Sequence, residues 1–369
     1  MSLTFAEPAV PAEAPADSWD EQAAKPSRPP LPAGDRHVLP FEQPVADLEQ
    51  RILDLDQRQR EDGGLDVRDE LRELRDTYAR LLRKTFDSLS AWQTVQVARH
   101  PQRPLFLDYV GMICREFKEL HGDRRFGDDR AIRCGLARVA GRKVMLMGHH
   151  KGRDTKERIE CMFGCANPEG YRKALRCMKL AEKFRLPVVA LVDTPGAFPG
   201  IGAEERGQAE SIAVNLMEMA RLRTPIVSVV IGEGGSGGAL GLAVADTVAM
   251  SQYAWYSVIS PEACSSILFK DASQAPRMAE SLKLTSRDLM KFGVIDAVVP
   301  EPVGGAHRDP YAAGQMLEQF LGRQLRELEK QAKTDMDALL DARYARFRRL
   351  GEYSEPAVDA APATLSAAG

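Results

Sequence analysis

Two glycine-rich segments are the parts of this 369-residue chain whose residue types and spacing could perform chemistry. One spans residues 193–202 and reads DTPGAFPGIG, and the other spans 232–240 and reads GEGGSGGAL. Each follows a short apolar run that predicts a strand, and each leads into a stretch that predicts a helix. Backbone N–H groups at the start of a helix lack partners within it, and glycine lets a ligand approach them closely. Such a loop can stabilise an oxyanion or a phosphate.

The second segment also matches the spacing of a dinucleotide-binding loop. Its Gly232, Gly234 and Gly237 satisfy G-x-G-x-x-G between a predicted strand and a predicted helix. The next strand region ends at a Ser-Pro pair before Glu262, which is a poor substitute for the acid that binds ribose. Neither segment ends in Gly-Lys-Ser/Thr, so a P-loop is excluded. NAD binding is therefore an alternative with weak support.

A serine nucleophile is the second alternative for the same segment. Gly234, Ser236 and Gly238 match G-x-S-x-G, and Asp296 and His307 follow in the chain order of α/β-hydrolases. Every intervening position of this match is itself a glycine, so the match carries little information. The histidine also lies in a segment bounded by glycine and proline, with no sign that it points at the loop.

Composition excludes several classes of partner. The chain has 50 basic and 53 acidic residues, so its formal charge of -3 gives no overall field that would favour nucleic acid or an anionic membrane. No apolar run approaches the roughly 20 residues that span a bilayer, and the first residues lack the pattern of a signal peptide. We therefore expect a cytoplasmic protein that binds neither membrane nor nucleic acid.

The six cysteines predict reduced thiols, because they are scattered through a long chain with no export signal. Cys161 and Cys165 are close enough in sequence to provide half of a zinc site. His149 and His150 are the nearby candidates to complete it, but no second cysteine pair follows. We therefore expect no metal in this chain.

The ends of the chain differ from its centre. Residues 1–40 and 354–369 are rich in alanine and proline and predict disorder. Residues 41–90 have apolar side chains at three- and four-residue steps and predict a helical hairpin. Residues 311–353 predict one long charged helix. Both helical regions are expected to pack against the body or a partner, not to perform chemistry.

The central part, residues 91–310, predicts an α/β core. Apolar runs at 144–147, 188–192 and 226–231 predict strands, and a helical stretch at 204–221 lies between the second and the third. A repeated strand-helix order is typical of βαβ units with right-handed crossovers. The predicted class is therefore α/β.

Longer strings allow a more specific comparison. They are WQ at 92–93, ARHPQRP at 98–104, GH at 148–149, KGR at 151–153, PEGYRKALR at 168–176, DTPGAFPG at 193–200, GAEERGQ at 202–208, VIGEGGSGGAL at 230–240, YSVISPE at 256–262 and PEPVGGAHR at 300–308. Together they resemble the alpha-subunit family of acetyl-CoA carboxylase carboxyltransferases, from about residue 41 to about residue 353. The resemblance implies a crotonase-like fold, a spiral of ββα units with flanking N- and C-terminal helices.

The resemblance also implies an activity shared between subunits. A separate beta subunit, which carries a zinc ribbon, would supply most contacts to acetyl-CoA, and this chain would serve the carboxybiotin side of the site. The carboxyl group would pass from carboxybiotin on the biotin carboxyl carrier protein to acetyl-CoA, giving malonyl-CoA for fatty-acid synthesis. Biotin carboxylase would complete the pathway, and the two carboxyltransferase subunits would form an α2β2 assembly.

Carried onto this sequence, the resemblance implies that Gly237 and Gly238 donate backbone N–H groups to the ureido oxygen of biotin. The residues expected to shape the substrate pocket are Gly196, Phe198, Gly200, Gly234 and Gly235. Lys151 and Arg153 belong to a basic stretch that could meet phosphates of CoA or an acidic face of the carrier, with a solvated loop as the alternative.

Some functions are not expected of this chain. Residues 177–180 (CMKL) superficially resemble a biotinylation sequence, but they lie in a helix predicted over 170–184, so Lys179 should be an ordinary surface lysine. No glycine-rich loop suits ATP. A non-catalytic scaffold, in which the glycine segments only pack against partners, is the remaining alternative.

Overall fold

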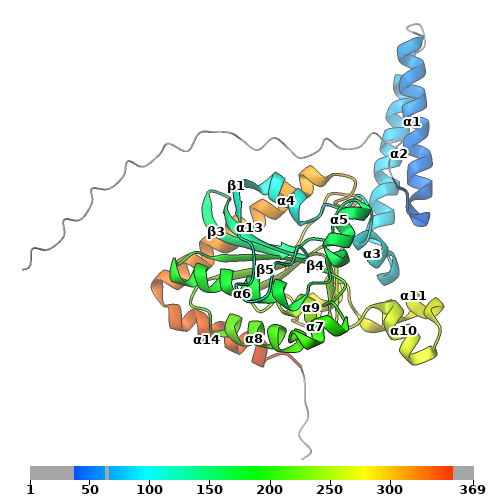
Figure 1. Cartoon of the computed structure of the whole chain (residues 1–369). Coiled ribbons are helices and arrows are strands. Elements are labelled where there is room, and N and C mark those ends of the chain that lie inside the picture. The colour runs from blue at the N-terminus through cyan, green and yellow to red at the C-terminus, as the bar shows by residue number, and fades with distance from the viewer. Residues whose placement is uncertain (1–36, 63–65, 352–369) are drawn as a thin grey trace, which may run out of the picture.

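The computed structural model describes residues 37–62 and 66–351 (Figure 1). The disorder predicted for 354–369 and for most of 1–40 therefore lies outside the described residues. Residues 37–40 are described, and Leu39 is buried in a cluster with Val45 and Phe86, so burial begins slightly before the predicted boundary at residue 41.

One sheet organises the described part of the chain. Its strands are β1 (Cys114–Glu119), β2 (Ile132–Val139), β3 (Arg142–His149), β4 (Val188–Thr194), β5 (Ile226–Gly235), β6 (Thr247–Ser251), β7 (Trp255–Ser257) and β8 (Ala297–Val299). The order is β1-β2-β3-β4-β5-β6-β8, and β7 pairs with the end of β5. The first three strands are antiparallel neighbours, and the pairs from β3 onward are parallel.

The central strands are buried along their whole length. Every residue of β4 and β5 is buried, which is typical of parallel strands covered by helices on both faces. Helix α6 (Pro168–Lys183) connects β3 to β4, and α8 (Gln208–Arg221) lies between β4 and β5. The predicted βαβ order is thus confirmed.

Helices cover the two faces of the sheet (Figure 1). On one face, α6 and α8 enclose a core that contains Met178, Met219 and Trp255. On the other face, α4 (Phe106–Ile113) and α13 (Pro310–Thr334) pack over a second core. The sheet is therefore packed between two separate apolar layers, which fix the positions of the parallel strands and of their carboxyl ends.

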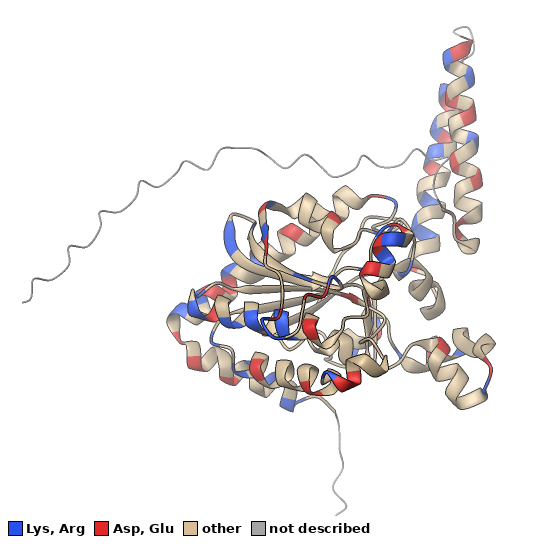
Figure 2. Ribbon diagram, viewed as in Figure 1, with Lys and Arg blue, Asp and Glu red and all other residues tan. Residues whose placement is uncertain are grey.

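The remaining helices are short or peripheral. They are α1 (Gln43–Glu61), α2 (Arg68–Asp87), α3 (Ala91–Ala98), α5 (Thr155–Glu160), α7 (Ile201–Glu205), α9 (Ser236–Leu240), α10 (Pro261–Phe269), α11 (Ala275–Leu282), α12 (Ser286–Lys291) and α14 (Met336–Arg348), with 3-10 turns at Pro40–Glu42, Met162–Gly164 and Ala272–Gln274. Helices α1 and α2 form a hairpin that projects from the body, with acidic and basic residues mixed along it (Figure 2). Among the described helices, none is long and apolar enough to cross a membrane.

Two predicted helices are each divided in the structure. The single helix expected over 311–353 breaks at Asp335, whose side chain accepts hydrogen bonds from the backbone N–H groups of Asp337 and Ala338 and so starts α14. The helix expected over 204–221 breaks at Gly207, which has a left-handed backbone with φ of 80° and separates α7 from α8. Local capping and a glycine override the continuous apolar periodicity in both places.

Candidate active site

The two glycine-rich segments lie against each other at the carboxyl ends of β4 and β5. A Cβ atom added to Gly238 would lie 2.5 Å from the backbone nitrogen of Ala197, and one added to Gly235 would overlap the carbonyl group of Pro195. Glycine is therefore required at both positions because backbone meets backbone there. In open α/β sheets, this edge is where ligands bind.

The second segment differs from the loop that the sequence predicts. Residues 232–235 belong to β5, and α9 begins directly at Ser236. The change of direction is concentrated in Ser236, whose φ of 49° is left-handed and rare for a residue with a side chain. The first backbone N–H groups of α9 have no acceptor within so short a helix.

Gly237 is the open position of this turn. A Cβ atom added there would meet nothing closer than the Ile212 side chain, at 3.9 Å. Gly237 is half-buried and Gly238 is buried. The turn therefore presents accessible backbone at Gly237, while Gly238 is packed against the first segment.

The first segment is held by its own Thr194 and Phe198 and by backbone carbonyl groups of residues 164 and 166. The Thr194 hydroxyl group donates to the Gly164 carbonyl oxygen at 2.7 Å and accepts from the Gly196 N–H group at 3.1 Å. Phe198 is half-buried, its N–H group donates to the Ala166 carbonyl oxygen, and its ring closes the space beside Gly200. These contacts fix the path of the segment as far as the start of α7.

A buried ion cluster ties the two segments together. The Lys151 ammonium lies 2.6 Å from Asp193 Oδ1 and 2.6 Å from Glu233 Oε2. Arg99 Nε lies 2.6 Å from the other oxygen of Glu233, and Arg99 also pairs with Glu262. Lys151, Asp193 and Glu233 come directly from the carboxyl ends of β3, β4 and β5, so the parallel sheet assembles them.

The protonation states in this cluster follow from its partners. Burial opposes the charged forms of Lys151 and Glu233. Asp193 and Glu233 nevertheless raise the pKa of Lys151, and Lys151 and Arg99 lower the pKa of Glu233. Both groups are therefore charged. His149, fully buried close to the Gly238 carbonyl group without a hydrogen bond of normal geometry, stays neutral because burial and Lys151 lower its pKa to about 3.

A cavity of about 200 Å³ lies beside the ion cluster. Arg99, Lys151, Phe163, Asp193 and Glu233 contribute to its wall. None of the predicted pocket glycines lines it, and neither does Phe198. The structure thus places the cavity on the Lys151 side of the glycine segments.

A strained turn borders this cavity. Met162 and Phe163 have left-handed backbones with φ of 46° and 55°, and Gly164 follows with φ of 86°. Two consecutive residues with side chains in this region are unusual, and such strain concentrates at functional sites. The Phe163 side chain is 57% exposed, so an aromatic ring stands at the mouth of the cavity.

The two basic residues predicted to meet phosphates are already engaged. Lys151 is held by two carboxylates, and Arg153 pairs with Asp108 and donates to the Pro101 carbonyl oxygen at 3.2 Å. Their contacts fit a structural task better than phosphate binding. Asp193 and Glu233 were not among the residues predicted from the sequence, although an acidic residue within two positions of the end of each apolar run was a usable signal.

Known proteins of one family resemble this chain over most of its length. A family model described as acetyl co-enzyme A carboxylase carboxyltransferase-like matches residues 38–351. The acetyl-coenzyme A carboxylase carboxyl transferase subunit alpha of Methylococcus capsulatus is 55% identical over 323 residues, which is 88% of this chain and 99% of that protein. The protein of the same name from Rhodopirellula baltica is 52% identical over 317 residues, 86% of this chain and 98% of that protein.

This chain belongs to the alpha-subunit family of acetyl-CoA carboxylase carboxyltransferases. A solved structure of transcarboxylase 12S supports the fold of the family, with a TM-score of 0.51 at 19% identity over 62% of this chain. The chain spans 42% of the length of that transcarboxylase chain. The crotonase-like fold expected from the sequence is thereby confirmed.

The structure does not support the two alternatives, a serine nucleophile and a dinucleotide-binding loop, which is consistent with membership in the carboxyltransferase alpha family. Asp296 accepts hydrogen bonds from Arg346 and from the Val248 N–H group, while His307 pairs with Glu42. No catalytic triad with Ser236 is therefore assembled. Glu262, the candidate acid for a ribose, pairs with Arg99.

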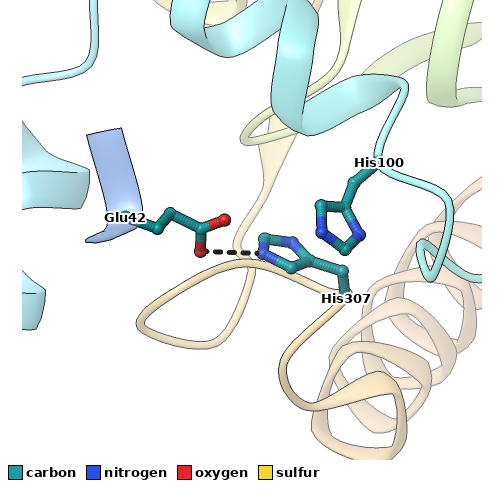
Figure 3. A group of neighbouring side chains, drawn as sticks. All are labelled: Glu42, His100 and His307. Carbon is teal, nitrogen blue, oxygen red and sulfur yellow. Dashed lines mark hydrogen bonds and ion pairs between the residues drawn. The ribbon is translucent and has the colours of Figure 1, made fainter. Parts of the chain in front are cut away.

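Cys161 and Cys165, which were considered as half of a zinc site, belong to no group with metal-ligand spacing in the described part of the chain. Among the described residues, the group with metal-ligand spacing is Glu42, His100 and His307, all buried (Figure 3). Both ring nitrogens of His100 are occupied, by the His37 carbonyl oxygen at 2.9 Å and by the Gln102 N–H group at 3.1 Å.

The Arg308 guanidinium group makes this group still less suited to a metal. It lies 3.2 Å from the same Glu42 oxygen that faces His307. A fixed cation thus already occupies the place beside the carboxylate where a metal ion would be needed. The group is better described as a closed hydrogen-bonded cluster that joins the N-terminal segment to the core.

Proposed function

We propose that this chain, working with a separate beta subunit, transfers the carboxyl group of carboxybiotin to acetyl-CoA and so forms malonyl-CoA. The observation that supports the proposal is the turn from β5 into α9. It combines an open backbone at Gly237 with glycine-only packing at Gly235 and Gly238. The turn suits a ligand that bears a negative oxygen and needs backbone donors but no reactive side chain.

The chemistry explains why few ionisable residues are needed. Carboxybiotin supplies both the carboxyl group and the base that removes the α proton of acetyl-CoA. The protein has to hold two developing oxyanions close together and exclude water. In this proposal the N–H groups of Gly237 and Gly238 stabilise the ureido oxygen of biotin, and the beta subunit stabilises the acyl-CoA enolate.

The family name implies a complex of several subunits, and we propose which proteins form it. The partners are a beta subunit with a zinc ribbon, the biotin carboxyl carrier protein and biotin carboxylase, with carboxyltransferase subunits arranged as α2β2. Gly196, Phe198 and Gly200 of the first segment would shape the wall of the biotin pocket. We expect the isolated chain to be inactive, since one of the two oxyanion sites is on the partner.

Substitutions at the turn test the backbone-amide proposal. Gly237→Val adds a side chain where the fold has room, so it should displace the ligand without disturbing the first segment. Losing one aligned oxyanion donor costs about 100- to 1000-fold in rate. We expect a loss of that order in kcat for the assembled enzyme, measured with carboxybiotin and acetyl-CoA.

Two matched variants sharpen this test. Ser236→Ala keeps its N–H group and should reduce kcat far less, because no covalent intermediate on serine is involved. Gly238→Val is a poor probe, since its Cβ would collide with the backbone of Gly196 and Ala197 and disturb the packing itself. A well-assembled but inactive Ser236→Ala enzyme beside a normal Gly237→Val enzyme would reverse the assignment.

Reconstitution tests whether the chain is catalytic or only a scaffold. Malonyl-CoA formation should be absent with either purified subunit and should appear when the two are mixed. Carboxyl transfer by this chain alone would contradict the two-subunit proposal. Full activity of a complex that contains Gly237→Val would support the scaffold alternative.

A further inference from the structure

Three parallel strands bring three charged side chains into contact next to the two glycine-rich segments. Lys151 follows β3, Asp193 lies near the end of β4 and Glu233 lies near the end of β5. The lysine bridges both carboxylates at 2.6 Å, and Asp193 Oδ1 also accepts the N–H group of Glu233 at 2.8 Å. The contacts join residues that are 40 and 82 positions apart in the chain.

Little space is left for these groups to move. The side chains of Asp193 and Glu233 are 5% and 8% exposed, and that of Lys151 is 17% exposed. A Cβ atom added to Gly232 would lie 2.5 Å from Asp193 Oδ1, so the β5 backbone presses against this carboxylate. Gly164 packs against the lysine stem in the same way.

The cluster is placed so that it sets the relative position of the two glycine segments. Asp193 precedes Gly196 by three residues in the first segment, and Glu233 precedes Gly237 by four residues in the second. Glu233 is joined to Gly237 without a loop, because β5 runs directly into α9, and only Thr194 and Pro195 lie between Asp193 and Gly196. A shift of the lysine would therefore displace both segments together.

A buried ion cluster of this kind is hard to explain by stability alone. Charges removed from water contribute little net stability relative to apolar side chains of similar volume. Both oxygens of Glu233 are used by separate cations, Lys151 and Arg99, so its orientation is fixed as well as its position. Exact placement of donors is what the proposed carboxyl transfer requires.

We propose that Lys151 and Glu233 are positioning residues for carboxyl transfer, which clamp the β5–α9 turn to the first glycine segment through Asp193. This inference rests on the proposed function and deepens it. Lys151 then acts through the backbone and does not contact a phosphate of CoA. Arg99 supports the clamp by holding the second oxygen of Glu233.

Glu233→Gln is the main test. The amide keeps the shape of the side chain but offers one oxygen instead of two, so either Lys151 or Arg99 faces an NH2 group. We expect kcat of the assembled enzyme to fall about 100-fold, the scale of a small misplacement of a catalytic group. The KM for acetyl-CoA should stay unchanged, because the partner subunit makes most of those contacts.

The opposite end of the same strand offers a matched control. Asp246 accepts the N–H group of Ile226, the first residue of β5, and pairs with fully buried Arg343 at 2.7 Å. Asp246→Asn should lower the melting temperature, as Glu233→Gln does, but it should leave kcat within about twofold. Equal kcat values for the two variants would overturn the positioning role.

A double-mutant cycle supplies the second measurement. Lys151→Met leaves two carboxylates without their shared cation, so kcat should fall at least as far as in Glu233→Gln. The two losses should be clearly less than multiplicative in the double variant Lys151→Met/Glu233→Gln, since both remove one interaction. Lys151→Arg, which keeps the charge, should recover part of the activity.

The outcomes separate this inference from the proposed function. Normal kcat in Gly237→Val would refute the backbone-amide site itself. Normal kcat in Glu233→Gln beside an impaired Gly237→Val enzyme would refute only the positioning role. If Lys151→Met raised the KM for acetyl-CoA at constant kcat, the lysine would be shown to bind substrate. That result would also overturn the positioning role.

Discussion

Two buried polar clusters in this chain look alike but differ in their surroundings. One joins Lys151, Asp193 and Glu233 at the carboxyl edge of the sheet, and the other joins Glu42 and His307 with their neighbours (Figure 3). Both connect segments far apart in sequence. The first borders a cavity of about 200 Å³, whereas the pocket beside the second is about 30 Å³, roughly the volume of one water molecule.

The difference shows that burial and charge do not by themselves identify a site. In the N-terminal cluster, Glu42 is shared by His307, Arg308 and the Leu39 N–H group, so the carboxylate is fully used inside the protein. The Lys151 cluster is also paired, but its Glu233 precedes Gly237 by four residues, and a Cβ atom added at Gly237 would meet nothing closer than 3.9 Å. The open backbone at Gly237, and not the buried charges alone, is what supports the proposed site.

The largest expected effect breaks the N-terminal cluster. Glu42→Ala leaves Arg308 and His307 buried without their carboxylate, and removing one partner of a buried pair costs about 3–5 kcal/mol. We expect that loss in the free energy of unfolding, measured by urea denaturation, with little change in kcat of the enzyme that remains folded. Glu49→Gln, at the more exposed oxygen partner of Arg308, should cost under about 1 kcal/mol.

This prediction would fail if Glu42→Ala were as stable as the parent protein. It would also fail if the variant kept its stability but lost kcat. Either result would remove the distinction between a structural and a functional cluster on which the comparison depends.

Glycine substitutions sharpen the comparison on the active-site side. Gly235→Ala forces its Cβ into the Pro195 carbonyl group and should destabilise the fold by about 3 kcal/mol, the upper range for overpacking. Gly237→Ala meets only ordinary contacts and should change stability by less than about 1 kcal/mol. Thermal unfolding of the two variants tests this predicted difference in stability. Equal melting temperatures would contradict the observed packing.

The N-terminal cluster should also make stability depend on pH. Burial, followed by repulsion from His307, lowers the pKa of His100 to about 4 from an ordinary value of 6.5. The unfolded chain then binds more protons between these two values, so the free energy of unfolding falls as the pH drops from about 6.5 to 4, by roughly 3 kcal/mol. Glu42, with its pKa lowered to about 2, adds its own loss only below about pH 4.5.

The control for this dependence is His100→Asn, which cannot titrate. Its unfolding free energy should change less than that of the parent protein over the same pH range, when His37, His307, Glu42 and Arg308 are all retained. Parallel curves for the two proteins would show that His100 does not titrate in this window.

The smallest expected effect concerns zinc. Both nitrogens of His100 are occupied and Arg308 lies beside Glu42, so the chain should hold no stoichiometric zinc at this cluster. Elemental analysis after dialysis against zinc should show none, and added zinc should leave the melting temperature unchanged. One tightly bound zinc, lost in His307→Ala, would show that the cluster can open to a metal.

Local sequence patterns were sufficient for a large part of the fold. The apolar runs before residues 193 and 232 mark buried parallel strands, and the helices between them follow the predicted order. Patterns failed where one residue decided the outcome, as at Asp335, where a cap divides the C-terminal helix. The glycines of the second segment were recognised, but the place of Gly232, Gly234 and Gly235 inside β5 was not.

The sequence by itself determined the family, the α/β class and the two glycine segments, because these depend on residue types that are neighbours in the chain. Only the tertiary structure decided which of those glycines is open and which is packed, since Gly237 and Gly238 differ only in what lies across from them. It also decided the role suggested for Lys151. Its partners come from strands 42 and 82 residues further along, and parallel pairing in the folded sheet, not local pattern, sets which side chains meet at that edge.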